Sequence, residues 1–374
     1  MGSGNHASSL LMLHLLGRCN LECRHCYMEG SPRRQERLPL DAVLGAIDEC
    51  PKLGIGTICI TGGEPFLYRD LDRVLEAAAA QPEVQTTLCT NGTLLTPRRA
   101  ARLHALGVRV NISIDGRPEF HDGFRNMAGA FSLSERGARA AVEADVPLTI
   151  ISSISQDNLE SLAFLVNWAA SLGAEQFLAQ PLLSLGRGEQ VADRCLSVNQ
   201  VNRLILELTD LANRPQHRNM RVQVIGARKK FLIDHPCGAF VCNGTGCHRR
   251  VAKEIKKLVV REDGTVLPEV PTLSRQYALG NINEEILSAL VNRYFMQAYD
   301  AFDRLCRSAY AEVIPAWECA IVPWEQIISE RSRTGNYEAM DSLPAVKCGT
   351  CGSTPYGRWP HRVVRIEKAT QSAN

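Results

Sequence analysis

Short apolar runs alternate with amphipathic stretches along the first half of the chain. The runs are short and mainly apolar, which favours strands, whereas the stretches between them repeat apolar residues with the period of a helix. The predicted strands are 10–16, 56–60, 84–90, 108–114, 147–154 and 175–180. The predicted helices between them are 39–53, 70–80, 96–106, 131–144 and 157–172. Alternation of this kind predicts an α/β fold built on a parallel sheet.

Six strand–helix units suit an open barrel, because right-handed crossovers bend successive units in the same direction. We therefore predict a partial (β/α)6 barrel, similar to part of a TIM barrel, over residues 10–190. In such sheets the active site lies at the carboxyl ends of the strands. Polar residues that directly follow the predicted strands are the first candidates for chemistry.

The pattern changes after about residue 190, where a small cysteine-rich extension is expected to follow the barrel. Two β-rich runs, 257–261 and 265–267, flank the dipeptide Asp263-Gly264, which is a strong signal for a hairpin. The other features of this region are a predicted helix over 197–212, a basic stretch over 218–230 and helices over 284–304. We divide the chain into a disordered N-terminus, a barrel domain, the extension and a polar tail, over 1–9, 10–190, 191–360 and 361–374.

The composition is that of an ordinary globular protein, since 45% of the 374 residues are hydrophobic and 22% are charged. A net charge of +2 gives no basic field of the kind that nucleic-acid-binding proteins carry, so we expect no nucleic-acid partner. The apolar run 10–16 is too short to span a bilayer, and no secretion signal is recognised, so we expect a cytoplasmic protein without a membrane partner. Fourteen cysteines in such a chain favour reduced thiols that bind metal or take part in catalysis.

Three of these cysteines, Cys19, Cys23 and Cys26, lie in one short segment after the first predicted strand. A closed zinc site needs four protein ligands, whereas iron–sulfur clusters are held by thiolates at similarly tight spacing. Three thiolates on a four-iron cluster leave one iron open to a small molecule. The alternative is a zinc site whose fourth ligand lies elsewhere in the sequence.

The triplet, together with Tyr27 directly after its third cysteine, resembles the radical S-adenosylmethionine (SAM) superfamily. The resemblance implies that the three cysteines hold a [4Fe–4S] cluster whose open iron binds the amino and carboxylate groups of SAM. It also implies that an electron, supplied by a donor such as flavodoxin or ferredoxin, cleaves SAM to a 5'-deoxyadenosyl radical that abstracts hydrogen from a substrate. The three cysteines are accordingly predicted to be catalytic and metal-binding, and Tyr27 to contact the cofactor.

A second motif, Thr61-Gly62-Gly63-Glu64-Pro65, directly follows the second predicted strand. Its two glycines allow the backbone to approach a ligand closely, and its carboxylate suits an ammonium group. The resemblance implies that Gly62, Gly63 and Glu64 bind the amino group of SAM. The alternative is an ordinary turn.

Polar residues also end the third and fourth predicted strands, and the resemblance extends to them. It implies that Asn91 and Ser113 form hydrogen bonds to the ribose and the carboxylate of SAM, whereas such residues also serve as strand caps. Asp115 is interpreted either as a contact to the bound molecules or as a turn former. Arg125 either neutralises a carboxylate at the site or pairs with Asp122 on the surface.

Five cysteines of the extension resemble the auxiliary-cluster (SPASM or twitch) extension of radical SAM enzymes that mature peptides and cofactors. They are Cys237, Cys242, Cys247, Cys348 and Cys351. The resemblance implies one auxiliary [4Fe–4S] cluster, with a structural zinc ion or no metal as the alternatives. One departure is Pro268-Glu269, which stands where that pattern has proline and cysteine. Four further cysteines, Cys50, Cys59, Cys89 and Cys195, are interpreted as small core residues.

These features predict a radical SAM enzyme. The preferred substrate is a ribosomally made peptide, modified by crosslinking, thioether formation or epimerisation. One alternative is a small biosynthetic intermediate, such as a tetrapyrrole or an antibiotic precursor, that is oxidised or rearranged. Another is an iron–sulfur scaffold or sensor without turnover. Only 18 residues precede Cys19, so we expect no leader-binding domain fused ahead of the barrel.

Overall fold

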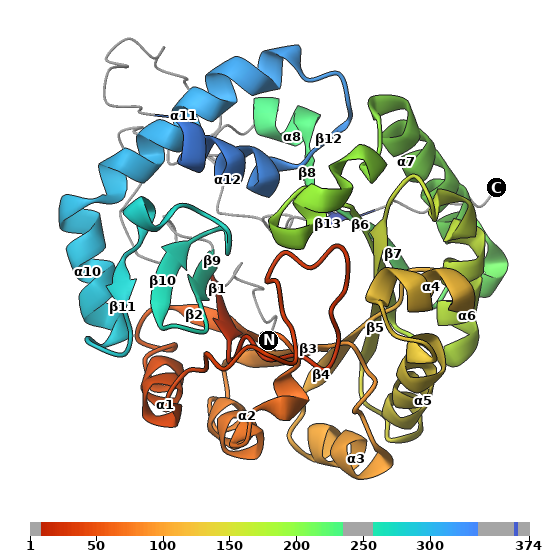
Figure 1. The fold of residues 1–374 in the computed structure, drawn as a ribbon, viewed down its shortest axis with the longest axis horizontal. Helices are drawn as coiled ribbons and strands as arrows, with labels where there is room; N and C mark the ends of the chain where they lie inside the picture. The colour runs from red at the N-terminus through yellow and green to blue at the C-terminus, as the bar shows by residue number, and fades with distance from the viewer. Residues whose placement is uncertain (1–8, 235–256, 336–362, 366–374) are drawn as a thin grey trace, which may run out of the picture.

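A computed structural model describes residues 9–234 and 257–335, together with the backbone of residues 363–365 (Figure 1). Six parallel strands follow one another across the sheet in chain order, each paired with the next. They are β1 (Ser9–His14), β2 (Ile55–Thr61), β3 (Gln85–Thr90), β4 (Arg109–Ser113), β5 (Leu148–Ile154) and β6 (Gln176–Pro181). All six predicted strands are confirmed to within two residues at each end, and the α/β fold with them.

Helices cover the outer face of this sheet (Figure 1). Five of them confirm the predicted helices: α1 (Leu40–Asp48), α2 (Leu71–Ala79), α3 (Pro97–Ala105), α5 (Ala130–Glu143) and α6 (Leu162–Leu172). The alternation of side chains along a strand explains the layering. In β2, Ile58 and Ile60 are fully buried in the main core, while Cys59 between them points to the opposite, inner face of the barrel.

One helix between β4 and α5, α4 (Pro118–Arg125), is absent from the sequence prediction. It begins with a proline at its first position, where the missing N–H costs nothing. Phe120 and Phe124, one turn apart, pack together with ring centroids 5.1 Å apart. The helix ends at Asn126 in the left-handed conformation, and its last residue is Arg125.

A seventh parallel strand, β7 (Arg221–Ile225), pairs with β6. The sequence prediction gave only a basic stretch here, because the arginines obscured an alternating apolar pattern in which Val222 and Val224 are buried. The preceding helix α7 (Val198–Asn213) confirms the predicted helix and begins with a capping box of Ser197 and Gln200. Part of the expected polar tail is ordered into a strand, because β13 (Val363–Arg365) pairs antiparallel with β7.

The predicted hairpin is confirmed and extends the barrel sheet at its other edge. Its first strand, β9 (Lys257–Val260), pairs parallel with β1, and β10 (Thr265–Pro268) returns antiparallel to β9. The turn uses Gly264 at a φ of 89°, a conformation that favours glycine. The short strand β11 (Gly280–Asn281) completes this edge, so that eleven strands of the described residues form one sheet.

Helices from the second half of the chain lie beyond this edge (Figure 1). The predicted helical region 284–304 consists of α10 (Leu287–Gln297) and the beginning of α11 (Tyr299–Ala316), which are separated at Ala298. The remaining elements are β8 (Ala227–Arg228), α8 (Lys229–Asp234), β12 (Ile321–Val322), α12 (Trp324–Thr334) and short 3-10 helices at 65–67, 159–161, 186–194, 215–217 and 275–277. None of the helices in the described ranges combines the length and the apolar character that crossing a membrane requires.

Gly137 of α5 packs closely against the turn after β3. An added Cβ there would collide with the carbonyl oxygen of Gly92. We predict that Gly137→Ala lowers the free energy of unfolding by about 1–3 kcal/mol, because backbone atoms cannot move aside cheaply. Gly45→Ala in α1 is the matched control, since nothing lies within 4 Å of its added Cβ. That change is expected to stabilise the protein by about 0.5–1 kcal/mol in urea titrations. Equal effects of the two substitutions would contradict the prediction.

Candidate active site

The segment between β1 and α1, residues 15–37, forms a long loop that we call the cysteine loop. In Figure 1 it crosses the middle of the ring of elements. It has no helix and only isolated bridges, which join Leu16 to Arg37 and Arg18 to Ser31. The loop carries the three predicted cluster cysteines.

The three thiols gather in a small cluster separate from the main core. Cys19 and Cys23 are buried and pack with Leu21, while the partly buried Cys26 and Met127 lie against them. This arrangement brings the predicted ligands together at one place in the loop. Across the described residues, no three side chains of the types His, Cys, Asp or Glu are placed to hold a single metal ion.

Each thiol faces at least one N–H donor. The backbone amide of Leu21 donates to Cys19 Sγ at 3.4 Å, and that of Gly30 donates to Cys26 Sγ at 3.4 Å. The Nη1 of Arg125 lies 3.8 Å from Cys23 Sγ. Burial raises the pKa of Cys19 to about 12, so this thiol loses its proton only when positive charge binds nearby. Buried sulfurs surrounded by N–H donors fit the requirements of metal-bound thiolates.

The two glycines after β2 allow it to lie directly against the cysteine loop. Gly62 has a φ of 147°, and an added Cβ there would lie 2.7 Å from the carbonyl oxygen of Leu16. An added Cβ at Gly63 would collide with the carbonyl of Arg18. The Gly63 amide donates to the Leu16 carbonyl at 2.7 Å. The close backbone approach expected of this motif is present, and it is made to the loop itself.

Glu64 is fully buried and joins the ends of β2 and β3. Its carboxylate accepts hydrogen bonds from the Thr90 hydroxyl at 2.7 Å, the Asn91 amide at 3.0 Å and the Phe66 amide at 3.2 Å. Burial raises the pKa of Glu64, while these three donors act in the opposite direction. A carboxylate has about four lone-pair sites, so roughly one remains after these bonds. The SAM-binding role of Glu64 stays a prediction.

Asn91 also turns toward the cysteine loop. Its side-chain amide donates to Asn20 Oδ1 at 2.9 Å, and its side-chain oxygen accepts from the Thr93 amide at 2.9 Å. Ser113 is the last residue of β4 and is partly exposed. Both residues lie at the carboxyl ends of neighbouring strands, as predicted, and their contacts to SAM stay predictions.

Asp115 and Arg125 form a buried ion pair beside the thiols. The Nε of Arg125 donates to Asp115 Oδ2 at 2.6 Å, and the Ser153 amide donates to Asp115 Oδ1 at 2.9 Å. Burial by itself would raise the pKa of Asp115, but Arg125 holds it at about 2, below its usual value. Asp115 is thus the counterion of Arg125, a role that neither sequence interpretation gave it.

The surface pairing considered for Arg125 is wrong. Asp122 instead accepts the backbone amides of Gly129 at 2.6 Å and Phe131 at 2.8 Å, which fixes the turn between α4 and α5. Arg125 therefore neutralises a carboxylate as considered, but that carboxylate belongs to the protein. Because its Nη1 also faces Cys23, the ion pair supports the cysteine loop.

Two histidines that the sequence interpretation did not assign to the site lie against this pair. His25 stacks on Phe124 with ring centroids 4.0 Å apart, and its Nε2 lies 4.0 Å from Asp115 Oδ2. The Nδ1 of His121 accepts the Asp115 amide at 3.1 Å. Burial lowers the pKa of His25 to about 3 and of His121 to about 4, so both rings are neutral near pH 7. His121 was missed in the sequence because α4, the helix that carries this residue, was not predicted.

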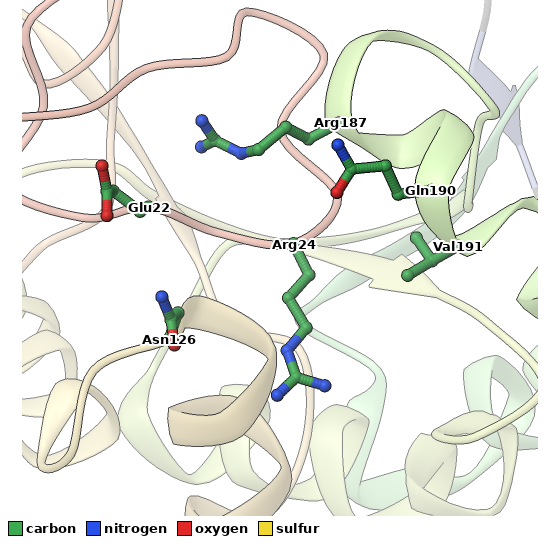
Figure 2. A pocket seen from close by; sticks show the side chains of 6 residues that line it. All are labelled: Glu22, Arg24, Asn126, Arg187, Gln190 and Val191. Atoms are coloured by element: carbon green, nitrogen blue, oxygen red, sulfur yellow. The ribbon is translucent and has the colours of Figure 1, made fainter.

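An open pocket of about 450 Å³ lies at the edge of the cysteine loop (Figure 2). It is lined by Glu22, Arg24, Asn126, Arg187, Gln190 and Val191. Arg187 holds the loop from the other side, because its Nε donates to the Cys23 carbonyl at 2.9 Å and its Nη2 to the Gly30 carbonyl at 2.8 Å. Figure 2 shows the side chain of Arg24 extending away from Arg187, past the end of α4. Its lining includes Glu22 and Arg24, the two sequence neighbours of the buried Cys23.

The predicted auxiliary cysteines lie outside the described residues; they are Cys237, Cys242, Cys247, Cys348 and Cys351. The nearby departure from the pattern is described. Glu269 follows β10 at a φ of 61°, its amide donates to the Lys257 carbonyl at 2.7 Å, and its side chain accepts the Lys257 amide at 3.2 Å. The residue in place of the expected cysteine thus closes the end of the hairpin.

Comparison with known proteins identifies the barrel. Residues 13–169, which include the cysteine loop and strands β2 to β5, match the profile described as the Radical SAM superfamily. Residues 13–169 form a radical SAM domain. The predicted family resemblance is confirmed for this part of the chain.

Two curated relatives and one solved structure illustrate the match. The chain is similar to the AdoMet-dependent heme synthase of Methanosarcina barkeri, with 35% identity over 188 residues, or 50% of this chain and 54% of that protein. It is also similar to the sporulation killing factor maturation protein SkfB of Bacillus subtilis, with 29% identity over 179 residues, or 48% of this chain and 43% of that protein. The alignments span about half the length of these relatives.

The fold of Streptococcus suis SuiB bound to S-adenosylmethionine superimposes with a TM-score of 0.62 at 18% sequence identity, covering 79% of this chain and 68% of that one. At this level of identity the likeness concerns the fold. It agrees with the partial barrel described above and extends beyond the 13–169 match.

The buried ion pair gives a stability prediction. Arg125→Met removes the counterion of Asp115, and leaving a carboxylate buried without its partner costs about 3–5 kcal/mol of unfolding free energy. In the double variant Asp115→Asn with Arg125→Met, no charge is left buried, so the loss should be smaller than the sum of the single losses. Arg139→Met is the control, because Arg139 and Glu135 form an exposed pair that contributes about 0–1 kcal/mol. Additive losses in the double variant, measured by urea unfolding, would contradict the prediction.

Proposed function

We propose that the three thiols of the cysteine loop hold a [4Fe–4S] cluster and that SAM binds beside it, at the carboxyl ends of β1 to β4. The observation that carries this proposal is the buried group of three thiols, each facing an N–H donor, beside the turn of Gly62, Gly63 and Glu64. A cluster and SAM bound there supply a 5'-deoxyadenosyl radical, which removes a hydrogen atom from a substrate. The protein contributes binding, orientation and exclusion of water.

The residues around the thiols then have distinct roles. We assign the remaining lone-pair site of Glu64 to the ammonium group of SAM, and the polar ends of β3 and β4, Asn91 and Ser113, to its ribose and carboxylate. Tyr27, which follows Cys26 directly, contacts the cofactor. Arg125 points an N–H donor at Cys23. Its charge is balanced by Asp115, so we assign this pair to holding the loop and not to binding a charged ligand.

The remaining parts of the assembly are proposals as well. We place one auxiliary [4Fe–4S] cluster on the cysteines of the extension, with the barrel over 10–190 and the extension over 191–360. A flavodoxin or ferredoxin supplies the electron. Iron content of the purified, reconstituted chain tests the number of clusters, because replacing Cys348 and Cys351 would then remove about four iron atoms per chain.

For the substrate we propose a ribosomally made peptide. Support comes from the similarity to SkfB, which is named as a maturation protein for a killing factor. The open pocket beside Cys23 presents charged side chains of both signs, Glu22, Arg24 and Arg187, which suits the ends and polar groups of a peptide.

A tetrapyrrole is the second candidate, because the chain is similar to a heme synthase over half of its length. The carboxylates of such a substrate would suit the two arginines of the same pocket. The two candidates are separated by adding either a peptide from a neighbouring short reading frame or an iron-bound porphyrin carboxylate to the reduced enzyme. Only the true substrate should raise the rate of 5'-deoxyadenosine formation above the substrate-free rate. The mass of that compound should also change during the reaction.

The activity itself is tested by replacing the thiols singly. Cys19→Ala, Cys23→Ala and Cys26→Ala should each abolish the formation of 5'-deoxyadenosine by the anaerobically reconstituted, reduced protein, because each removes a ligand. Cys50→Ala is the control, since Cys50 is buried at the end of α1, away from the loop. Liquid chromatography with mass detection measures the product. Continued cleavage of SAM by any of the three variants would refute the assignment.

A further inference from the structure

Two cysteines that we interpreted as small core residues touch each other on the inner face of the barrel. Cys59 of β2 and Cys89 of β3 have their sulfur atoms 3.5 Å apart. In the strand register Cys59 lies opposite Thr87, so Cys89 is its diagonal neighbour on the same face. Their outward-facing neighbours Ile60 and Leu88 are fully buried in the main core. The two thiols therefore face the inside of the barrel, whereas Ile60 and Leu88 pack in the main core.

The surroundings of the two sulfurs differ. The side-chain amide of Asn111 on β4 donates to Cys89 Sγ at 3.4 Å. The hydrogen bond between the two sulfurs lowers the pKa of Cys89 and raises that of Cys59. Cys59 therefore holds its proton more tightly than Cys89, whose sulfur accepts the Asn111 amide. Cys89 is also partly exposed, whereas Cys59 is 8% exposed.

The pair lies directly beneath the polar strand ends. Cys59 precedes Thr61, the last residue of β2, by two positions, and Cys89 precedes Asn91 by two positions. At about 3.3 Å per residue, the thiols lie roughly 7 Å below that layer along the strands. On the neighbouring strand β1, Met12 lies opposite Cys59 and His14 opposite Thr61.

Tyr27 connects this part of the inner face to the cysteine loop. Its hydroxyl lies 3.4 Å from the Nε2 of His14, a ring that is fully buried and whose Nδ1 has no hydrogen-bond partner among the described residues. Because Tyr27 directly follows Cys26, the two thiols and the proposed cluster ligands border the same inner space. A carbon radical formed at the strand ends would face this dithiol.

We propose that Cys59 and Cys89 form a redox-active dithiol that donates a hydrogen atom to a carbon radical formed above it. This rests on the proposed function, which generates the radical. The S–H bond of Cys59 breaks, the hydrogen atom forms a C–H bond with the radical carbon, and the unpaired electron moves to Cys59 sulfur. The transfer is favourable because a thiol S–H bond is weaker than an alkyl C–H bond.

The partner sulfur gives the pair a defined end state. The Cys59 sulfur radical bonds to the Cys89 sulfur at contact distance while the partly exposed Cys89 thiol releases its proton to solvent, and a disulfide radical anion forms. This species gives one electron to an oxidised flavodoxin or ferredoxin and becomes a disulfide. An external dithiol then restores both thiols by thiol–disulfide exchange. The cycle needs both cysteines, which distinguishes it from donation by an isolated thiol.

The test uses the 5'-deoxyadenosyl radical itself as the probe, so no substrate is needed. Thiol protons exchange with solvent, whereas carbon-bound hydrogens do not. The full-length, reconstituted protein is given SAM and reduced flavodoxin in D2O without substrate, and the deuterium content of 5'-deoxyadenosine is measured. The dithiol predicts that most of the product carries one deuterium and that peptide mapping finds a Cys59–Cys89 disulfide.

Variants separate the pair from other thiols. Cys59→Ser should reduce the deuterated fraction at least fivefold, because a hydroxyl O–H bond is too strong to donate, and Cys89→Ser should abolish the disulfide. Cys195→Ser is the control and should change neither result, because Cys195 lies outside the inner face, at the end of the 186–194 helix. If a serine variant folds poorly, the proposal is still tested by two measurements on the wild-type protein. These are the deuterium content of 5'-deoxyadenosine and the presence of the Cys59–Cys89 disulfide in the peptide map.

The outcomes are distinct. Formation of 5'-deoxyadenosine without deuterium by the wild-type protein would overturn the dithiol proposal and leave the proposed function standing. Deuterium incorporation that persists in Cys59→Ser would also overturn it. Failure of the wild-type protein to form any 5'-deoxyadenosine would overturn the proposed function and the hydrogen transfer together.

Discussion

The cysteine loop has almost no secondary structure of its own, so its polar backbone and its thiols need partners from the strand ends. A buried backbone group without a hydrogen bond is costly, and this loop runs across the inside of the barrel mouth. The Leu16 carbonyl accepts a hydrogen bond from the Gly63 amide, and the Cys23 carbonyl accepts one from the Arg187 side chain. Residues far apart in the sequence thus fix one loop, and the position of the three thiols depends on them.

The same polar network couples the fold to the proposed chemistry. Glu64 links the end of β2 to the end of β3 by hydrogen bonds. The ion pair of Asp115 and Arg125 links the end of β4 to α4, and Arg125 also contacts Cys23. These groups are buried, where the local dielectric constant is low and a lost partner is expensive. Stability and the geometry of the site therefore depend on the same side chains, and a substitution in the network is expected to affect both.

The sequence predicted most of the barrel, because a parallel strand buried on one face and a helix with one apolar face leave different periods in the sequence. It failed where charges obscure the period, as in β7, and where a helix is short and contains a glycine, as in α4. The positions of the polar motifs at strand ends were predicted from the motifs alone. Their partners were not, because the pairing of Asp115 with Arg125 requires the helix that brings Arg125 back over the strand.

The contact between Cys59 and Cys89 shows a second limit of sequence reasoning. Each cysteine alone is indistinguishable from a small core residue. The contact follows from strand order and register, which place the two residues diagonally on the inner face. Alternation within one strand indicates which face a residue occupies, but it does not indicate which residue of the next strand lies beside it.

The central claim is that three thiols of the cysteine loop hold a four-iron cluster with one iron open to SAM. Electron paramagnetic resonance of the anaerobically reconstituted and reduced protein, recorded before and after addition of SAM, tests it most directly. The account predicts a [4Fe–4S] signal that changes on addition of SAM, and a Cys23→Ala variant in which this SAM-dependent component is absent. A signal that does not respond to SAM, or a zinc ion bound by the three thiols, would contradict the account.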